Sequence, residues 1–545
     1  MTHTNGADHM HATDPNTSDG PHAGPSLDPE LNLRLKQPRG GVPGRIVALV
    51  VALAVIVSFT LAWMLKPSGA AGGVTRQDSV AIGLNLAPTN LDIRSTAGTA
   101  LDQLLIGNVY EGLLSRNEQN EAVPGLAKSW DVSADGTQYT FALNTGVKFS
   151  NGDAMDADDV VWSINELVKH QYHDANQLKF FKSVSAPDSH TVTITLSQPY
   201  AQLPWALTTR AGLVFDKDAS YNYRTKAIGT GPYVITSFIP NDSVSLTANK
   251  HYWNIVQPQT PHITIKYFTD DNAAVNALSS GSIQVLSPIT ASLAAPFRDN
   301  DHYVVRAGDG TDKYVLAMNN APGQPTANKD VREAIRYAID TKQLIAARGG
   351  ADSALGGPIP SLDPGYEDLT GLYPHDVAKA RSLLARAGYT KDHPLKLTLT
   401  YSNTYGTEIG NQLRSQLKQA NIDLTVHVVE FSTWLQQVYT DKNYQLSLVD
   451  HNESHDFASS WANPDYYFNY HNQRVQELTE QALSSTSAEE SDKLLAQAAR
   501  IVSEDAAADW LFNYRITTAM DAGVSGFPTV MNQIHMPLVN VVYVK

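Results

Sequence analysis

Hydrophobic and polar residues follow two alternating patterns along most of this 545-residue chain. Segments in which apolar residues recur at every second position predict strands at 80–86, 192–196, 263–267, 395–401 and 424–428. Between them, apolar residues at i, i+3 and i+4 follow a capping side chain, which predicts helices capped by Asp156, Asp330 and Asp376. Strands mixed with helices along the whole length indicate an α/β fold.

One segment has a third pattern, without a polar face. Residues 46–65 read IVALVVALAVIVSFTLAWML, and about 20 apolar residues suffice to cross the hydrocarbon core of a membrane. Basic residues precede this segment, among them Arg39 and Arg45, so the positive-inside rule keeps the N-terminus in the cytoplasm. We expect a transmembrane signal-anchor helix at 46–65 that places the rest of the chain outside the cytoplasm.

A cleaved signal peptide is the alternative interpretation of the same segment. Ser68-Gly69-Ala70 offers small residues for cleavage, which would release a secreted protein. The apolar run is longer than the usual core of a signal peptide, and this favours the uncleaved anchor. Residues 1–45 show no apolar period and are predicted to form a disordered cytoplasmic tail, followed after the helix by a flexible linker at 66–78.

Charge and composition exclude several classes of function. The formal net charge of −15 argues against a nucleic-acid partner, because phosphate binding needs an excess of Lys and Arg. The chain contains no cysteine, which excludes disulfides, thiol catalysis and a lipid-modified cysteine as the membrane tether.

Motifs of enzymes and cofactor sites are absent from the sequence. It contains no G-x-S-x-G, H-E-x-x-H, P-loop or G-x-G-x-x-G, so we expect neither catalysis nor a cofactor. His451 and His455 lie four residues apart around a glutamate, a spacing that would suit a metal on a helix. Because this segment follows a predicted strand and precedes no helical period, we expect a loop and no metal site.

A series of short blocks in a fixed order resembles one known family. The early blocks are Val109-Tyr110-Glu111-Gly112-Leu113, Pro124-Gly125-Leu126-Ala127, Ser129-Trp130, Asp135-Gly136, Tyr139-Thr140-Phe141, Val147-Lys148-Phe149, Asn151-Gly152 and Asp158-Asp159-Val160. The later blocks are Gly229-Thr230-Gly231-Pro232-Tyr233, Asn249-Lys250-His251-Tyr252-Trp253, Asp330-Val331-Arg332 and Ala380-Arg381-Ser382-Leu383-Leu384. Over residues 78–545 the chain is similar to the oligopeptide/dipeptide/nickel family of ABC-importer solute-binding proteins.

This resemblance implies a two-lobed, periplasmic-binding-protein-like α/β fold with an extra subdomain. By position, we expect the first lobe at 79–310, with the extra subdomain at about 121–224, the second lobe at 311–505, and a return to the first lobe at 506–545. The two segments that cross between the lobes are expected near 314–319 and 505–510.

The resemblance also implies a function. We expect a binding protein that captures a peptide between hinged lobes and delivers it to the permease subunits of an ABC importer. A nickel ion or metal chelate, an oligosaccharide, and a role as a ligand sensor remain alternatives. The expected partners are the ligand, the permease and the cytoplasmic membrane, and we expect a monomer.

Candidate ligand-binding residues follow from the same resemblance. Peptide-binding members place an aspartate after a second-lobe strand, and here the strand at 444–449 is followed by a loop rich in carboxylates and aromatic rings. We expect Asp456 to pair with the ligand's ammonium, with Asp450 as the alternative, because a buried charge must be paired. The full set of candidates also includes Phe457 and Trp461 in this loop and Thr89, Asn90 and Asp92 after the first strand.

Overall fold

A computed structural model of the protein describes residues 75–545. Within this range, no helix is both long enough and apolar enough to cross a membrane. The expected anchor helix at 46–65 and the expected tail at 1–45 lie outside the described residues.

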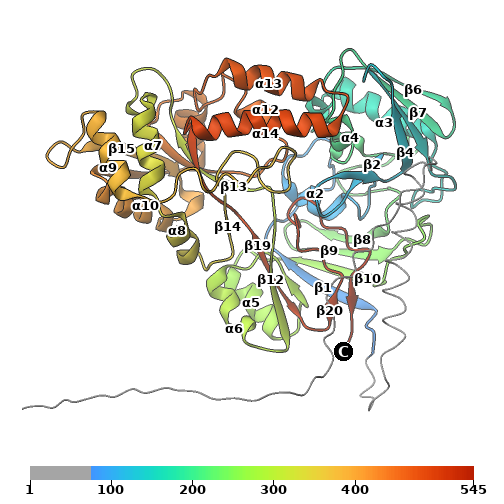
Figure 1. Ribbon diagram of the computed structural model, residues 1–545. Coiled ribbons are helices and arrows are strands. Elements are labelled where there is room, and N and C mark those ends of the chain that lie inside the picture. Colours follow the sequence, from blue (N-terminus) through green and yellow to red (C-terminus); the bar gives the residue numbers. More distant parts are fainter. Residues whose placement is uncertain (1–74) are drawn as a thin grey trace, which may run out of the picture. The chain divides into compact units, whose positions relative to one another are not determined.

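A seven-stranded sheet forms the centre of the first lobe (Figure 1). Its strands, in spatial order, are β12 (Tyr303–Gly308), β19 (Ile516–Asp521), β11 (Val285–Leu286), β1 (Ser79–Leu84), β10 (His262–Tyr267), β9 (Ser243–Ala248) and β8 (Tyr233–Ile239). The helices of this lobe are α2 (Thr99–Leu105), α5 (Asp271–Ser279) and α6 (Ala291–Arg298), and a small sheet joins β20 (Val524–Ser525) to β21 (Val542–Tyr543).

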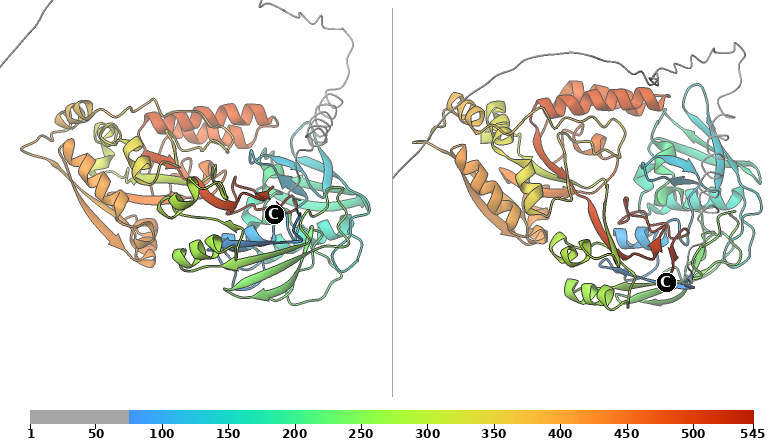
Figure 2. Two further views of the ribbon diagram at one scale, coloured as in Figure 1. Left: turned by 90° about the horizontal axis from the view of Figure 1, so that it is seen from below. Right: turned by 60° about the horizontal axis from the view of Figure 1, so that its bottom comes forward.

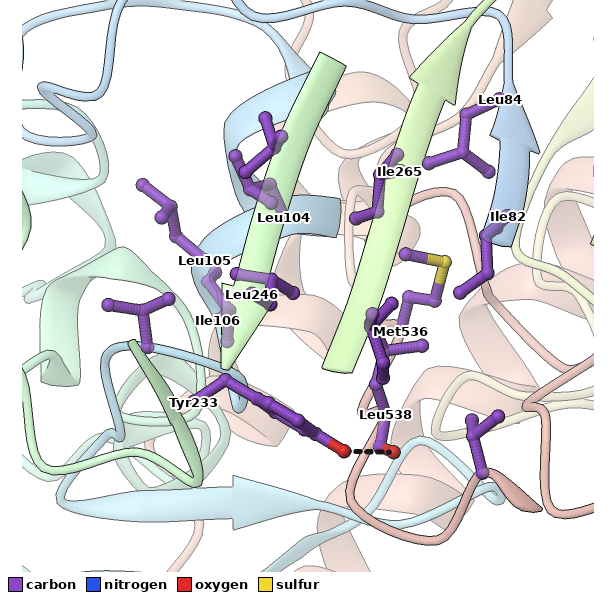
Figure 3. Packing of buried hydrophobic residues seen from close by; sticks show 14 of the residues in the cluster. Ile82, Leu84, Leu104, Leu105, Ile106, Tyr233, Leu246, Ile265, Met536 and Leu538 are labelled. Atoms are coloured by element: carbon purple, nitrogen blue, oxygen red, sulfur yellow. Dashed lines mark hydrogen bonds between the residues drawn. The ribbon is translucent and has the colours of Figure 1, made fainter. Parts of the chain in front are cut away.

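The core of the first lobe joins residues from both ends of the described chain. Figure 3 shows Ile82 and Ile265 from paired strands packed near Met536 and Leu538 from the C-terminal segment. The Tyr233 hydroxyl lies 3.3 Å from the Leu538 carbonyl oxygen, to which it donates a hydrogen bond. The return of the chain to this lobe therefore fills its core.

A four-stranded sheet makes the extra subdomain. Its strands are β4 (Ala127–Val132), β5 (Gln138–Leu143), β7 (Thr191–Leu196) and β6 (Phe181–Asp188), and a hairpin of β2 (Leu114–Arg116) and β3 (Ala122–Pro124) precedes them. Its helices are α3 (Ala157–His170), α4 (Leu203–Ala206), η1 (Ala175–Gln177) and η2 (Arg210–Gly212). Asp156 caps α3 in a capping box with Asp159, as the sequence predicts.

Three of the sequence blocks meet where the subdomain joins the first lobe. The Glu111 carboxylate accepts hydrogen bonds from Thr230 Oγ1 at 2.7 Å and from Trp253 Nε1 at 2.8 Å. At Gly229 a Cβ atom would lie only 2.0 Å from the Val109 carbonyl oxygen, so glycine is required by this close approach. These blocks therefore hold the scaffold together.

The second lobe is built on a six-stranded sheet with helices on both faces. Its strands, in spatial order, are β14 (Ser353–Ala354), β18 (Ala508–Asn513), β13 (Lys313–Met318), β17 (Leu446–His451), β15 (Leu395–Ser402) and β16 (Ile422–Val429). One face packs with α7 (Lys329–Ala338), α8 (Thr341–Ala347), α9 (Val377–Arg386) and α10 (Glu408–Gln419). The other packs with α11 (Phe431–Trp434), the π-helical η5 (Leu435–Thr440), α12 (Phe457–Ser460), α13 (Gln473–Leu483) and α14 (Ala488–Glu504). Two 3-10 turns are η3 (Pro325–Ala327) and η4 (Asn403–Tyr405). Figure 2 shows α13 and α14 lying side by side.

The capping residue predicted from the sequence is confirmed for one helix of this lobe and differs for another. Asp376 caps α9 by accepting a hydrogen bond from the Lys379 backbone, as predicted. The cap of α7 is Asn328, and the prediction of Asp330 was wrong. Asp330 lies in the first turn of α7 and forms an ion pair with Arg386 instead.

The two lobes are joined by two short segments. Residues 309–312 lead from β12 to β13, and Tyr514 and Arg515 lead from β18 back to β19. Of the segments expected to cross, residues 314–318 of the first belong to β13 and residues 508–510 of the second belong to β18. Both of these strands are almost wholly buried, which places them inside the second sheet and moves the crossings to their polar ends. The two-lobed α/β architecture itself is confirmed.

A buried ion pair in the second lobe yields a stability prediction. Arg336 Nε lies 3.2 Å from Asp509 Oδ1, and both side chains are at least nine-tenths buried. Arg336→Gln leaves the carboxylate without its counter-charge, and we expect the free energy of unfolding in urea to fall by about 3–5 kcal/mol. The control Arg386→Gln breaks a more exposed pair and should change stability much less. Equal losses in the two variants would contradict the assigned role of Arg336.

Candidate functional site

A groove of about 960 Å³ lies between the subdomain and the second lobe. Residues on its walls include Trp130, Tyr139 and Trp205 from the subdomain and Tyr366, His455 and Lys493 from the second lobe. Aromatic rings with a few polar groups are typical of sites for small ligands. The groove is therefore the first candidate for a ligand-binding site.

The two walls touch at one end of the groove. Asn120 Nδ2 donates hydrogen bonds to Asp363 Oδ1 at 2.9 Å and to the Leu362 carbonyl oxygen at 3.1 Å. The Trp205 and His455 rings stack with centroids 3.9 Å apart and planes 17° apart. The subdomain and the second lobe are thus in contact, and the structure represents a closed arrangement of these two parts.

A second contact closes the groove further along. The Ala201 backbone N–H donates to the Leu483 carbonyl oxygen over 3.0 Å, joining the subdomain to the end of α13. Gly136 lies beside Thr486 in the turn between α13 and α14. This turn therefore serves as a support for the closed arrangement.

A buried lysine lies among several acidic groups near the contact between the subdomain and the second lobe. Lys313 is 1% exposed at the start of β13, and its ammonium lies 3.1 Å from Asp456 Oδ1. It also donates a hydrogen bond of 2.8 Å to the Glu453 carbonyl oxygen. Burial alone would lower the pKa of Lys313, but Asp456 and Asp363 outweigh this effect and raise it. Lys313 therefore stays charged and requires its carboxylate neighbours.

Asp363 is the second carboxylate near this lysine. Its two oxygens accept hydrogen bonds from Asn120 Nδ2 and from the His455 backbone N–H, each over 2.9 Å. Burial raises the pKa of Asp363 to about 7, although Lys313 and Arg116 act in the opposite direction. This carboxyl group, unlike Asp456, is bonded directly to the subdomain.

The structure separates the predicted residues of the 450–468 loop into different environments. Asp456 is buried and already paired with Lys313, so its carboxylate is not free. Phe457 and Trp461 lie in the apolar core under α13 and α14, where Trp461 stacks on Phe468 at 4.1 Å. Neither aromatic ring lines the groove.

Asp450 differs from Asp456 in lacking a counter-ion in contact. It lies near the end of β17, opposite Tyr314 on β13, and its Oδ1 is buried without a hydrogen-bond partner among the described residues. Burial and the neighbouring Asp312 raise the pKa of Asp450 well above its usual range. The parallel strands β15 and β17 end at this edge, which gathers the polar ends of second-lobe strands in one place.

The predicted loop after β1 uses most of its polar groups internally. Asn90 Oδ1 accepts hydrogen bonds from the Asp92 backbone and from Thr96. Asp92 in turn pairs with Arg94 at 3.1 Å, and only Thr89 of the three candidates is exposed. None of the three lines the groove.

Sequence analysis missed four polar residues that the structure brings together. Asn120, Trp205, Lys313 and Asp363 belong to segments far apart in sequence, and no local spacing connects them. Lys313 carries the clearest signal, because it is a charge at the start of the apolar strand KYVLAM. Asp363, followed by proline and glycine, reads as an ordinary turn residue.

The loop expected around His451 and His455 is present, with His451 at the end of β17. Over residues 75–545, no group of three or more His, Asp or Glu side chains is arranged to hold a metal ion. His455 has positive φ of 56°, and both its ring nitrogens are buried without partners among these residues.

Two groups at the contact between the walls should respond to pH in opposite directions. Burial at this contact raises the pKa of Asp363 to about 7, so we expect opening to release a proton and closure to weaken as pH rises from about 4 to about 7. Burial, with Arg116 and Lys313, holds the pKa of His455 well below its usual value. Protonation of His455 below about pH 6.5 therefore favours opening.

Single variants separate the effect of Asp363 titration on closure from that of His455 titration. In His455→Phe, which keeps an aromatic ring against Trp205, the radius of gyration from X-ray scattering should decrease between about pH 8 and about pH 5. In Asp363→Asn the same change should increase it, because protonation of His455 then opposes closure without the compensating proton on Asp363. Responses of the same sign in both variants would contradict the assignment.

Comparison with known proteins agrees with the two-lobed fold. Residues 121–474 match the family described as bacterial extracellular solute-binding proteins, family 5. The glutathione-binding protein GsiB of Pectobacterium atrosepticum is 27% identical over 456 residues, 79% of this chain and 88% of that protein.

Two solved structures share the fold. DppA from Helicobacter pylori, in complex with the peptide STSA, has a TM-score of 0.70 at 21% identity, over 86% of this chain and 98% of that one. NikA from Brucella suis, in complex with Fe(III)-EDTA, has a TM-score of 0.75 at 22% identity, over 85% and 99%. The family match spans more than half of the chain, and the protein belongs to the family 5 extracellular solute-binding proteins of ABC importers.

Proposed function

We propose that this protein captures peptides between its two lobes and delivers them to the permease of an ABC importer. The observation that carries the proposal is the groove of about 960 Å³ whose walls combine aromatic rings with acidic and basic groups, since a peptide offers both an ammonium and a carboxylate. Asp363, Asp492 and Lys493 are among these groups on the second lobe, and Glu121 lies on the subdomain. The ligands named for two of the relatives, glutathione and STSA, have the same chemistry.

We infer that Asp450, rather than Asp456, meets the ligand's ammonium group. Asp456 is already neutralised by Lys313, whereas Asp450 Oδ1 is buried without a partner in the described part of the chain. An arriving ammonium would supply the missing hydrogen bond and counter-charge. Phe457 and Trp461 then contribute by supporting the loop from within the core.

The loop after β1 is the proposed contribution of the first lobe. Its side chains at Asn90 and Asp92 hold the loop in shape through internal hydrogen bonds. Thr89 is exposed, so the backbone beside it is available to an extended peptide as an added strand.

The proposal is tested by exposing the protein to a tetrapeptide library. Native mass spectrometry should recover unchanged peptides bound to it, and scattering should show compaction, because a ligand between hinged lobes favours the closed state. Cleaved peptides would indicate an enzyme instead. A metal chelate or sugar carried through purification would contradict a peptide ligand.

Two aspartate variants test the ammonium site. Asp450→Asn should weaken peptide binding in calorimetry by about 2–5 kcal/mol, with little loss of stability in the free protein. Asp456→Asn should instead lower the melting temperature, because it leaves Lys313 without its nearest counter-charge. The exposed Asp465→Asn serves as control. Unchanged affinity in Asp450→Asn together with lost affinity in a stable Asp456→Asn would reverse the assignment.

We also propose that the segment 46–65 stays uncleaved and anchors the protein to the cytoplasmic membrane, with the body outside. The apolar run and the absence of any cysteine for lipid attachment support this. Membrane fractions should contain protein whose N-terminal sequence begins near residue 1. A soluble form that begins near residue 71 would show that the segment is a cleaved signal peptide.

A further inference from the structure

Two adjacent apolar residues, Ile255 and Val256, are exposed on the loop between β9 and β10, and we call them the apolar tip. Ile255 is 95% exposed and Val256 is 45% exposed, whereas no other large apolar side chain of residues 75–545 is more than 52% exposed. Single exposed apolar residues are ordinary on a protein surface. Ile255 differs from the others of this protein because the fold covers almost none of it.

The loop that carries the apolar tip is held at both ends. Before the tip, Trp253 Nε1 donates a hydrogen bond of 2.8 Å to the Glu111 carboxylate. After it, the Gln259 backbone N–H donates over 2.8 Å to a carbonyl oxygen of the C-terminal segment. Within the loop, the Val256 backbone N–H donates over 3.1 Å to Asn254 Oδ1. Folding the tip back onto the protein surface would disturb these hydrogen bonds, so the turn keeps Ile255 in water.

The apolar tip lies near the point where the chain enters the first lobe. The Arg76 guanidinium donates hydrogen bonds to the backbone and side-chain oxygens of Gln259. The strand that follows, β1, pairs with the start of β10, so Arg76 and the loop share one end of the seven-stranded sheet. Residues 66–75 separate Arg76 from the apolar run 46–65, and a chain of that length spans at most about 40 Å. A membrane that holds this run therefore lies close to the same end of the sheet.

This end of the sheet is the one away from the crossing segments. β12 ends and β19 begins at those segments, where Gly308 pairs with Ile516. β11 runs antiparallel to β19 and parallel to β1, so β1 begins at the opposite end. In Figure 1 the C-terminus, where Lys545 pairs with Thr75, marks this opposite end. A surface bound there leaves the crossing segments uncovered.

We propose that the apolar tip docks the first lobe on the lipid surface, with Ile255 and Val256 entering the boundary between headgroups and acyl chains. This inference rests on the proposed anchorage by residues 46–65, which keeps the lobe beside a membrane. Burial of one aliphatic side chain favours the buried state by about 10- to 100-fold, and a tether raises the local concentration of lipid. The contact is small and reversible, so it orients the tethered body and still allows it to turn.

The absence of cysteine from the chain allows a single label to report on the tip. Full-length protein with Val256→Cys is labelled with the fluorophore NBD and reconstituted into phosphatidylcholine liposomes, at a ratio that leaves most vesicles with a single copy. Its emission should shift to the blue, and lipids that carry a nitroxide near the headgroup should quench it. The control Ile239→Cys carries the same label at an exposed apolar residue on the opposite end of β8 and β9, where we expect no quenching.

A second variant tests Ile255 itself. With the label at Val256, Ile255→Ser should lower the equilibrium constant for docking, obtained from the quenched fraction, by about 10-fold or more. The matched substitution Ile239→Ser should leave the quenching unchanged. The melting temperature of Ile255→Ser should equal that of the parent, because the side chain is already in water. Quenching that persists in Ile255→Ser would overturn the role of the tip.

The outcomes also separate docking from anchorage. Labelled protein that floats with the liposomes but is not quenched at Val256, or is quenched equally at Ile239, overturns docking and leaves the anchor standing. Protein that does not float with the liposomes overturns the anchor and the docking together. A blue shift without quenching by lipid would assign the tip to a contact with another copy of the protein and overturn the lipid contact.

Discussion

The buried ammonium of Lys313 sets the arrangement on which the rest of the site depends. A lysine at the start of a buried strand is stable there only if carboxylate and carbonyl oxygens surround it. Asp456 and the Glu453 carbonyl oxygen meet this need, and both come from the loop that follows β17. The loop therefore packs against Lys313, the first residue of β13. This residue directly follows the segment 309–312 that crosses between the lobes. The path of the loop then carries His455 outward to the Trp205 ring on the subdomain.

The need to neutralise Lys313 also links the ionisation of nearby groups to the contact between the subdomain and the second lobe. Asp363 contributes to the field around Lys313 and is bonded across the groove to Asn120, so one carboxyl group belongs to both the second lobe and the contact between the walls. Closure buries this group beside Asp456, which favours its neutral form, and it buries the neutral ring of His455 as well. The contact is thus made mostly of groups in their uncharged forms. Such a contact is weak enough to open, and a ligand that adds charges of the right sign can strengthen it.

Local rules predicted the scaffold well, but they do not show which distant polar groups the fold brings together. Period-two segments and side-chain caps such as Asp156 and Asp376 are properties of neighbouring residues, and most of them were right. Asp330 failed as a cap because Asn328, two residues earlier, competes for the same role. Phe457 and Trp461 were grouped with a ligand site on the family resemblance and the composition of their loop, but nothing local shows which face of a loop enters the core. Lys313 and Asp363 lie fifty residues apart in sequence, and only tertiary packing brings them together.

The family resemblance transfers the fold more reliably than the ligand chemistry, and Lys313 explains why. An aspartate after the second-lobe strand can pair with a ligand ammonium only if the protein leaves it unpaired. Here an internal lysine occupies that place, so the same aspartate becomes part of the scaffold. We propose that recognition then shifts to Asp450 on the second lobe, whose Oδ1 is buried without a hydrogen-bond partner among the described residues. An internal counter-charge can in this way assign an aspartate to the scaffold, so that a shared fold does not determine which residue contacts the ligand.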